Sequence, residues 1–485
     1  MSAGEEPLLG RTDSTRRCGR CCTEAVSLLR WSMLAACTVG PGTVVVCAKA
    51  GADFDLRLMW TLLFASLAAF VMQSQAARLT IESGISFGQA IRLRFDGDAS
   101  TGDNVPFMAW VALVGVLIGN SAYTANCFVG ALGALHVLFE SNWWFNITVS
   151  VVTAAITLVA LLCANLDQLG KALGVCILAM TVVFALTASR VVVNGSEFGR
   201  GLLPDIPGGS SRTVLSMVGT TAIPFNMFLA ASMTSGSDLG QATRGIGFAS
   251  LLTAVISILI VIVGSAIVIE DPNADFTIED LGNQIGKQIG ETGKIFFCIG
   301  LYAAAYSSAI TCPLGAALTA QQILSEGREE SASNARQATR LLSQQQLASY
   351  ERLSLRKSHQ SLSPHRKFSL AQQEKAVQRW KSGGTYFNGS MIVIVCGSAV
   401  VSSSPVSTVG VIILAQVING LLLPIISICL ALCINDETIV AAPPSVLGNI
   451  LLMAVVYVTL FLAFHLIADE VATFPPVRPP PRYYN

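Results

Sequence analysis

Long apolar stretches follow one another along most of this 485-residue chain. A stretch of about 20 apolar residues is long enough to cross the hydrocarbon core of a bilayer as a helix. The pattern predicts eleven membrane-spanning helices, at residues 26–50, 56–78, 106–135, 143–164, 168–188, 213–235, 245–269, 292–322, 387–407, 408–433 and 446–467. The chain is therefore expected to be an all-α polytopic membrane protein.

Two of the predicted helices are interrupted near their middles by residues that break helices. The first is interrupted at residues 39–43 (Val-Gly-Pro-Gly-Thr) and the sixth at residues 220–226 (Thr-Thr-Ala-Ile-Pro-Phe-Asn). Such breaks release backbone N–H and C=O groups, which lipid cannot satisfy, so they occur where protein or a water-filled cavity surrounds them. Two breaks in corresponding places of two halves are typical of the binding site of a secondary transporter.

Composition agrees with a membrane protein and excludes several function classes. The chain is 52% hydrophobic and 12% charged, whereas soluble domains carry roughly 25% charged residues. Lys+Arg and Asp+Glu both number 30, so no nucleic-acid partner is expected. No nucleophile–base pair or cluster of metal-ligating residues is visible, so we expect neither an enzyme nor a bound cofactor.

The distribution of basic residues predicts the orientation in the membrane. Arginines are frequent before the first span, and basic residues are frequent in the polar insert at residues 325–386. Basic flanks favour the cytoplasmic side, and eleven spans place both segments on that side. The acidic loop that follows the seventh span then faces outward, as does the C-terminal tail.

Four short motifs, in this order, resemble those of the natural resistance-associated macrophage protein (NRAMP) family of divalent-metal transporters. Residues 40–43 stand where the family has Asp-Pro-Gly-Asn, and residues 223–226 stand where it has Met-Pro-His-Asn. Residues 300–308 are similar to the family's eighth-span pattern, and Gln416 with the Leu-Pro at 423–424 is similar to its tenth-span pattern. The resemblance implies a LeuT-like 5+5 inverted repeat with discontinuous helices 1 and 6 and one additional helix.

This resemblance also implies how the chain is divided. The expected parts are a cytoplasmic tail (1–25), a first repeat (26–188), an external loop (189–212), a second repeat that includes the basic insert (213–433), an eleventh span (446–467) and a Pro-rich tail (468–485).

The chain departs from the family at the positions that carry its chemistry. The family holds its metal through an Asp and an Asn in the first break and a Met in the second, and here those positions are Gly40, Thr43 and Ile223. Carbonyl, hydroxyl and water oxygens suit Mg²⁺, which keeps several of its waters when bound. The substituted site therefore resembles that of the NRAMP-related magnesium transporters. The predicted substrate-binding residues are Gly40, Thr43, Thr220, Thr221, Ile223, Asn226 and Gln416.

The family's proton route is also substituted. Its sixth-span His is Phe225 here, and its third-span acidic residues are Asn120 and Tyr123. The resemblance therefore implies transport that is not coupled to protons by the family's usual route. We expect these three side chains to line the cavity.

These observations favour a divalent-metal transporter that works by alternating access, with Mg²⁺ ahead of Mn²⁺ or Fe²⁺. A carrier of amino acids or other small organic solutes on the same scaffold is the first alternative, because the N-terminus of a half-helix can bind a substrate carboxylate. A transport-inactive regulator is the second. An ion-versus-amino-acid uptake panel discriminates among these alternatives.

The remaining predictions concern modification and location. Asn194 is the expected glycosylation site, and Cys18, Cys21 and Cys22 are candidates for palmitoylation beside the membrane. The protein is expected to act as a monomer surrounded by lipid, in the plasma membrane or in an endosomal or vacuolar membrane.

Overall fold

The computed structural model describes residues 34–35, 37–95, 105–140, 142–163, 178, 181–234, 238–267, 276–326, 379, 384–440 and 444–473. Within these ranges the chain forms helices and no β-strand. Nine helical segments there are long and apolar enough to cross a membrane, and the chain is an integral membrane protein. The predicted first and fifth spans lie partly outside the described residues. The predicted N-terminal tail lies wholly outside them, and so does most of the basic insert.

The helices are α2 (Pro41–Phe54), α3 (Met59–Ser83), α4 (Phe87–Phe95), α5 (Phe107–His136), α6 (Trp143–Cys163), α8 (Gly195–Gly201), α9 (Ser211–Thr221), α10 (Phe225–Thr234), α11 (Leu239–Gly264), α12 (Ile278–Ile289), α13 (Glu291–Gln321), the π-helical turn η1 (Gln322–Glu326), α16 (Thr385–Ser403), α17 (Thr408–Ile434) and α18 (Val446–Thr473).

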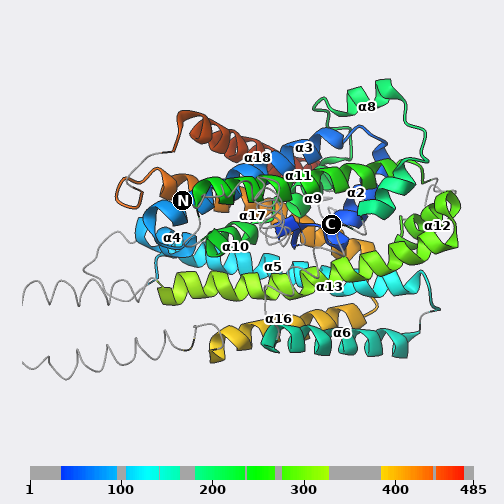
Figure 1. Cartoon of the computed structure of the whole chain (residues 1–485), viewed down its shortest axis with the longest axis horizontal. Helices are drawn as coiled ribbons and strands as arrows, with labels where there is room; N and C mark the ends of the chain where they lie inside the picture. Colours follow the sequence, from blue (N-terminus) through cyan, green and yellow to red (C-terminus); the bar gives the residue numbers. More distant parts are fainter. Residues whose placement is uncertain are drawn as a thin grey trace, which may run out of the picture.

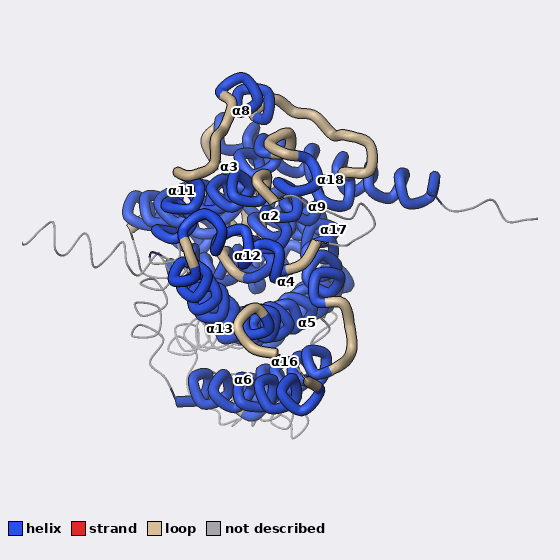
Figure 2. The backbone as a smooth tube through the Cα atoms, turned by 90° about the vertical axis from the view of Figure 1, so that its right-hand side faces the viewer, coloured by secondary structure: helices blue, strands red, loops and turns tan. Residues whose placement is uncertain are grey.

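The two broken spans lie at the centre of the bundle. α2 continues the first span after its break, and α9 and α10 are the two halves of the sixth. α2 and α9 pack against α17 and against each other, while α5 packs along α13 beside them. Seen along the bundle, α6 lies at its edge beside α16, which packs against α5 and α13 (Figure 2). This arrangement surrounds both breaks with helices.

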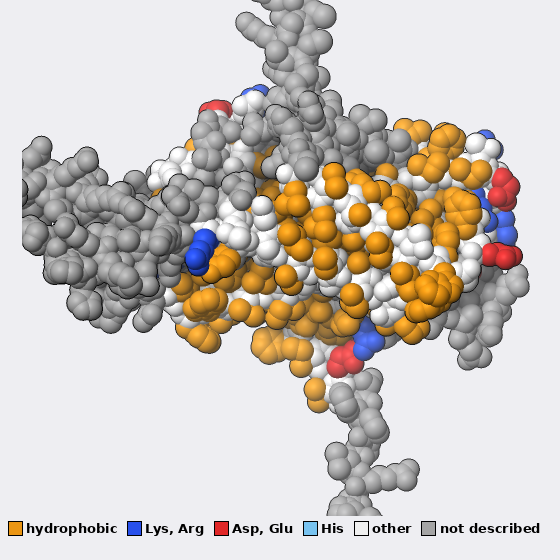
Figure 3. Space-filling model, turned by 90° about the horizontal axis from the view of Figure 1, so that it is seen from below, with side chains coloured by type: hydrophobic (Ala, Val, Ile, Leu, Met, Phe, Trp, Pro, Cys, Tyr) orange, Lys and Arg blue, Asp and Glu red, His pale blue; other side chains and the backbone are white. Residues whose placement is uncertain are grey.

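Helices α6 and α16 have an apolar exposed face. Val151 and Val159 of α6 are 59% and 62% exposed, and Val393 and Val400 of α16 are 72% and 66% exposed. On the side of the molecule drawn in Figure 3, hydrophobic side chains spread over the described surface, and the visible charged side chains lie near its margins. A continuous apolar surface of this kind meets lipid in a membrane protein.

Glycines bring the second half of the broken first span against α11. A Cβ atom added to Gly51 would lie 2.3 Å from the carbonyl oxygen of Val261, and one added to Gly264 would lie 2.3 Å from that of Ala48. Membrane helices use small residues in this way because close backbone approach replaces the hydrophobic drive that lipid removes. The contact fixes the direction in which α2 leaves the break.

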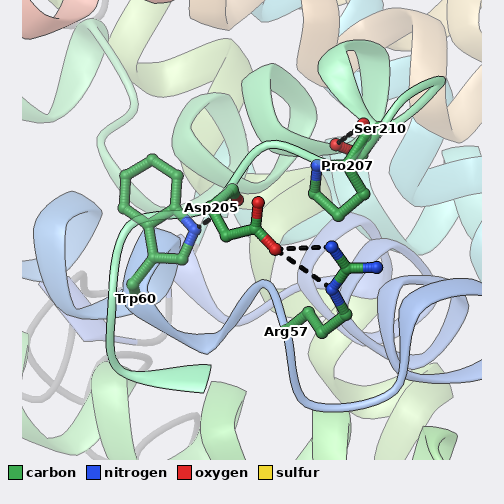
Figure 4. A network of polar contacts seen from close by, with 5 residues as sticks. All are labelled: Arg57, Trp60, Asp205, Pro207 and Ser210. Carbon is green, nitrogen blue, oxygen red and sulfur yellow. Dashed lines mark hydrogen bonds and ion pairs between the residues drawn. The ribbon is translucent and has the colours of Figure 1, made fainter. Parts of the chain in front are cut away.

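An ion pair and hydrogen bonds fasten the loop before α9 to the start of α3, at the predicted outer end (Figure 4). The Arg57 guanidinium lies 2.6 and 3.1 Å from one carboxylate oxygen of Asp205. The Trp60 indole donates to the backbone oxygen of Asp205 at 2.9 Å, and Ser210 donates to the oxygen of Pro207 at 2.7 Å. We call these contacts the outer clasp. They position the entry into the first half of the sixth span.

A single glutamine fastens three elements at the opposite, predicted cytoplasmic end. Gln322, in the π-helical turn after α13, donates from its amide nitrogen to the backbone oxygen of Phe228 at 3.1 Å and to the Ser232 hydroxyl at 2.7 Å. Its amide oxygen accepts from the backbone N–H of Gly88 at 3.1 Å. We call these contacts the inner clasp. It joins α13 to α10 and to the short helix α4.

An ion pair joins α4 to the end of α17 at the same end of the bundle. Arg94 lies 3.1 Å from Asp436. The Thr438 hydroxyl donates to Asp436 at 2.6 Å, and this bond together with Arg94 holds the pKa of Asp436 below its usual value. The carboxylate therefore stays ionised at neutral pH.

Three short helices were not predicted: α4, α8 and α12. A search for long apolar stretches cannot find them, because they combine polar and apolar residues and lie at the ends of the bundle (Figure 1). α12 begins at a capping box in which Thr277 and Asp280 bond each other's backbone N–H groups. α8 lies within the segment predicted as an external loop.

α11 and α18 extend beyond the predicted spans by about six residues each. α11 begins at Leu239 rather than near 245, because Asp238 caps it by accepting from the N–H of Gln241. α18 continues to Thr473, through the start of the segment predicted as a Pro-rich tail. Its last turns are held by side-chain bonds to α9, from Ser211 to Asp469 and from Arg212 to Glu470.

The glycine contact between α2 and α11 can be tested with one matched pair of substitutions. Gly51→Ala is expected to lower the unfolding free energy by about 1–3 kcal/mol, because the added methyl meets backbone and the helices must separate. Gly397→Ala, in α16 with nothing within 4 Å, is expected to leave it unchanged or raise it by up to about 1 kcal/mol. Thermal unfolding in detergent measures both, and equal effects would contradict the packing argument.

Candidate functional site

The first break is built from Gly40 and Pro41. Gly40 is the N-cap of α2 in an extended conformation (φ −113°, ψ −171°), and Pro41 occupies the first helical position. Proline suits that position because it has no N–H to satisfy and its φ is already helical. The Gly40 N–H donates to the oxygen of Thr38 at 3.1 Å, which ends the first half of the span.

The second break is a short turn between α9 and α10. The N–H of Ala222 closes α9 on Val218 at 2.8 Å, and the N–H of Asn226 donates to the oxygen of Ile223 at 3.1 Å. The last carbonyls of α9 and the first N–H groups of α10 have no partner within their own helices. The break therefore offers backbone acceptors and donors to the centre of the bundle.

Hydroxyl and amide groups join the two breaks directly. The Thr43 hydroxyl donates to the backbone oxygen of Thr38 at 2.6 Å and lies 3.0 Å from the Thr220 hydroxyl. The Asn226 amide donates to the Thr38 hydroxyl at 3.1 Å, and the Tyr123 hydroxyl donates to the Thr38 backbone oxygen at 3.3 Å. Thr38 is thus the residue on which both breaks and α5 converge.

Two buried carboxamides beside this network have no partner on either end. In the described part of the chain, neither the oxygen nor the nitrogen of Asn126 or of Gln416 has a hydrogen-bonding partner, and both side chains are fully buried. A Cβ on Gly42 would lie 2.1 Å from the Gln416 nitrogen and 2.9 Å from that of Asn126. An unpaired buried polar group costs about 1–3 kcal/mol. The arrangement therefore fits a site whose ligand or water supplies the missing bonds.

More unpaired polar atoms are buried on the helices that surround the breaks. Asn226 has an unpaired oxygen, Asn120 and Asn419 have unpaired amide nitrogens, and Thr221 has an unpaired hydroxyl. All four residues are at most 1% exposed. Asn419 lies against α5, since a Cβ on Gly119 would be 2.6 Å from its oxygen. The centre of the bundle is polar yet carries no formal charge on these side chains.

The predicted residues Ile223 and Phe225 have different surroundings. The Ile223 side chain is 2% exposed and packs in the apolar core, so the atom it turns to the break is its backbone oxygen. Phe225 fills the space beside Gly315, whose Cβ would lie 2.5 Å from the ring, and meets Tyr123 edge-on with centroids 6.4 Å apart. Apolar packing occupies the position of the family's histidine.

The remaining predicted positions have separate surroundings. Gly40 is buried, and a Cβ there would lie 2.8 Å from the Ser308 hydroxyl of α13. Asn194 is exposed at the start of α8, where its side chain accepts from the N–H of Ser196. Cys18, Cys21 and Cys22 lie outside the described residues.

Sequence reasoning missed Thr38, Asn126 and Asn419. A usable signal was present for two of them: Asn126 follows Asn120 and Tyr123 at steps of three, and Asn419 follows Gln416 by three. Residues three apart share a face of a helix. Nothing marked Thr38, which precedes the break by two residues.

The close contact at Gly42 predicts a substitution that disturbs the site without disturbing the fold. In Gly42→Ala the added methyl meets the end of a flexible side chain, so Gln416 is displaced and the melting temperature stays within about 3 °C of wild type. In Gly219→Ala the methyl would lie 2.0 Å from the backbone oxygen of Gln416, and the melting temperature falls further. Thermal unfolding distinguishes the two, and a large loss in Gly42→Ala would mean that Gln416 cannot move.

The sequence is similar to those of known metal transporters. Residues 32–346 match the family model described as natural resistance-associated macrophage protein-like. The chain is 26% identical over 299 residues to metal transporter Nramp3 of Oryza sativa subsp. japonica, covering 56% of this chain and 52% of that protein. It is 26% identical over 312 residues to the divalent metal cation transporter MntH of Pediococcus pentosaceus, covering 59% and 66%. The chain thus spans about half the length of the plant relative.

Solved structures share the fold. A manganese transporter of Eremococcus coleocola superposes with a TM-score of 0.59 at 16% identity, covering 98% of this chain and 91% of that one. MhsT in complex with L-phenylalanine superposes with a TM-score of 0.54 at 14% identity, covering 92% and 98%. The predicted LeuT-like fold is confirmed.

Proposed function

We propose, on the premise that the chain belongs to the natural resistance-associated macrophage protein family, that it carries a divalent metal ion across its membrane by alternating access. Relatives named as metal transporters support this class of substrate. The observation that carries the proposal is the group of unpaired buried carboxamides at the first break. Such groups are retained against their cost where a ligand satisfies them.

The chemistry of these groups favours hydrated Mg²⁺ over Mn²⁺ or Fe²⁺. In the resemblance, Ile223 stands in place of the family's thioether ligand, and Gly40 and Thr43 stand in place of its carboxylate and amide ligands. A thioether favours transition metals, so its loss weakens the case for Mn²⁺ or Fe²⁺. Mg²⁺ gives up its waters reluctantly. Those waters would donate to the oxygens of Asn126 and Gln416, and the negative ends of the two first half-helices would add about half an elementary charge each.

Proton coupling by the family's usual route does not fit the site residues. Phe225 has no proton to exchange, and Tyr123 donates its hydroxyl to the backbone of Thr38. Without that proton route, the ion would move down its own electrochemical gradient.

Within the described residues no group of three or more His, Cys, Asp or Glu side chains is placed to hold a metal, so the proposed ligands are neutral oxygens.

The two clasps give the alternating-access cycle its mechanical elements. The outer clasp holds the entry to α9, and the inner clasp holds α10 to α13 and α4. Both are formed together, and the residues of the breaks are buried, as expected for an occluded state. Opening toward either side requires one clasp to separate while the other stays formed.

An organic solute carrier is the second candidate, and one observation favours it. The unpaired atoms include amide N–H donors on Asn126 and Gln416, beside the N-terminus of α2. Donors of this kind suit a carboxylate as well as they suit water. A zwitterionic solute would satisfy these groups without bringing net charge into a neutral site.

Uptake into proteoliposomes tests the proposal. Mg²⁺ uptake exceeding Mn²⁺ uptake, without internal acidification, is expected from the wild type. Gln416→Ala, Asn126→Ala and Thr43→Ala are expected to lower it at least about tenfold, the loss that corresponds to one hydrogen bond of about 1.4 kcal/mol. Gln75→Ala is the matched control and keeps wild-type uptake, because this carboxamide on α3, whose oxygen is buried, lies against Gly448 of α18.

Three outcomes would redirect the proposal. Uptake of a labelled amino acid with no metal uptake supports the organic solute carrier, and uptake of neither supports a transport-inactive regulator. Wild-type rates in all three site variants would remove these residues from the binding site.

The inner clasp predicts a change in access from the cytoplasmic side. Gln322→Leu removes all three bonds of the clasp, so the state open to that side gains population. Alkylation of Cys37, which is fully buried before the first break, is then expected to become several-fold faster. Peptide mass spectrometry measures the modified fraction. Gln284→Leu, on α12 at the opposite end, is the control, and equal rates in both variants would show that Gln322 does not close this path.

A further inference from the structure

A second group of buried polar residues lies beside the breaks and does not include Asn126 or Gln416. These residues line a cavity of about 10 Å³ between the first half of the broken first span, α3, α9 and α11. Its polar lining includes Thr38, Ser66, Gln73, Thr221 and Thr253. A volume of that size accommodates about one water-sized particle.

Three of the residues that line this cavity carry buried oxygens without a partner. Ser66 Oγ, Gln73 Oε1 and Thr221 Oγ1 have no hydrogen-bonding partner in the described part of the chain. The three residues are 7%, 5% and 1% exposed, so bulk water does not supply the missing bonds. The Thr253 hydroxyl donates to the oxygen of Ala249 at 3.0 Å, which leaves its lone pairs free to accept. The lining therefore offers oxygen atoms from several helices.

The partial charges of the helix ends around the cavity favour a cation of low charge. Thr221 is the last residue of α9, and Thr38 is close to the end of the first half-helix, so the negative ends of two helices converge here. No carboxylate lines the cavity, and neither does Lys, Arg or His. The space holds about one water-sized particle, so a divalent cation could not keep its hydration shell here. Converging partial negative charges with no formal charge suit a bare monovalent cation.

We propose that this cavity binds Na⁺. Na⁺ is a hard cation that takes carbonyl and hydroxyl oxygens, and it fits a space the size of one water molecule, whereas K⁺ needs longer bonds to the same oxygens. The unwound carbonyls and C-terminal ends of half-helices are where transporters of this architecture bind small cations. The site is separate from the carboxamides that we assign to the transported substrate.

Bound Na⁺ would also organise the transport site. Thr38 lines the cavity and at the same time bonds Thr43, Tyr123 and Asn226. An ion that fixes Thr38 therefore fixes the network that joins the two breaks. Because Na⁺ binding can be measured with no transported substrate present, this inference goes beyond the proposed function and stands apart from the identity of the substrate.

Thermal unfolding of the full chain in lipid nanodiscs tests the inference, with divalent cations removed and ionic strength held constant. NaCl is expected to raise the melting temperature along a saturable curve, because an ion that binds only the folded state stabilises it. KCl and choline chloride are expected to give no such rise. Thr221→Val and Ser66→Ala are expected to abolish the Na⁺ dependence.

Thr61→Val is the matched control. Its hydroxyl is also buried and unpaired, on the same helix as Ser66, but it does not line the cavity, so the Na⁺ dependence is kept. Equal melting temperatures in all three salts would show that the cavity holds water only, and an equal response to KCl would overturn the assignment to Na⁺. If either cavity variant fails to fold, the wild-type comparison of salts still decides. Loss of metal uptake with an intact Na⁺ response would reject the proposed function and leave this inference standing.

Discussion

The structure depends on satisfying the backbone groups that the two breaks release inside a membrane. Lipid offers no hydrogen bonds, so each freed carbonyl and N–H must find a partner in the protein, in trapped water or in a ligand. Thr43 and Tyr123 bond the carbonyl of Thr38, and Asn226 bonds its hydroxyl, which ties both breaks and α5 together. The glycine contacts of α2 with α11 and of α9 with α17 then hold the half-helices in place.

The same constraint explains why the centre is polar without being charged. Carboxylates would supply negative charge for a metal, but each would be expensive to bury when the site is unliganded. Asn126 and Gln416 offer donors and acceptors at a lower cost of burial, and helix ends supply partial charge without any titratable group. Under the proposed function, such a site would bind its ligand through the ligand's hydration shell or through the site's own polar groups. The fold remains that of the Eremococcus coleocola manganese transporter.

Much of this architecture follows from sequence, because long apolar spans and the Gly-Pro-Gly and Ile-Pro-Phe-Asn breaks are local signals. Thr43, Thr220 and Asn226 lie within the break motifs themselves, whereas Gln416 was indicated by the resemblance of its segment to the family's tenth span. Asn126 and Thr38 were missed because their importance arises only when α5 and the first span are packed together. The short helices α4 and α12 were missed because their polar and apolar residues serve the ends of the bundle, not lipid. The unpaired state of the carboxamides is a property of packing that no motif records.

The inner clasp has a further consequence for how the cytoplasmic side opens. Gln322 donates from its amide nitrogen to the backbone oxygen of Phe228 in α10, and its amide oxygen accepts from the N–H of Gly88 in α4. Because the carboxamide is planar and rigid, a tilt of α10 that pulls its nitrogen end away also turns its oxygen end off Gly88. The three bonds therefore all depend on one side chain, and a movement of α10 that displaces it weakens the contacts with α10 and with α4 together. In the proposed transport cycle, one substitution at this position would loosen two helices at once.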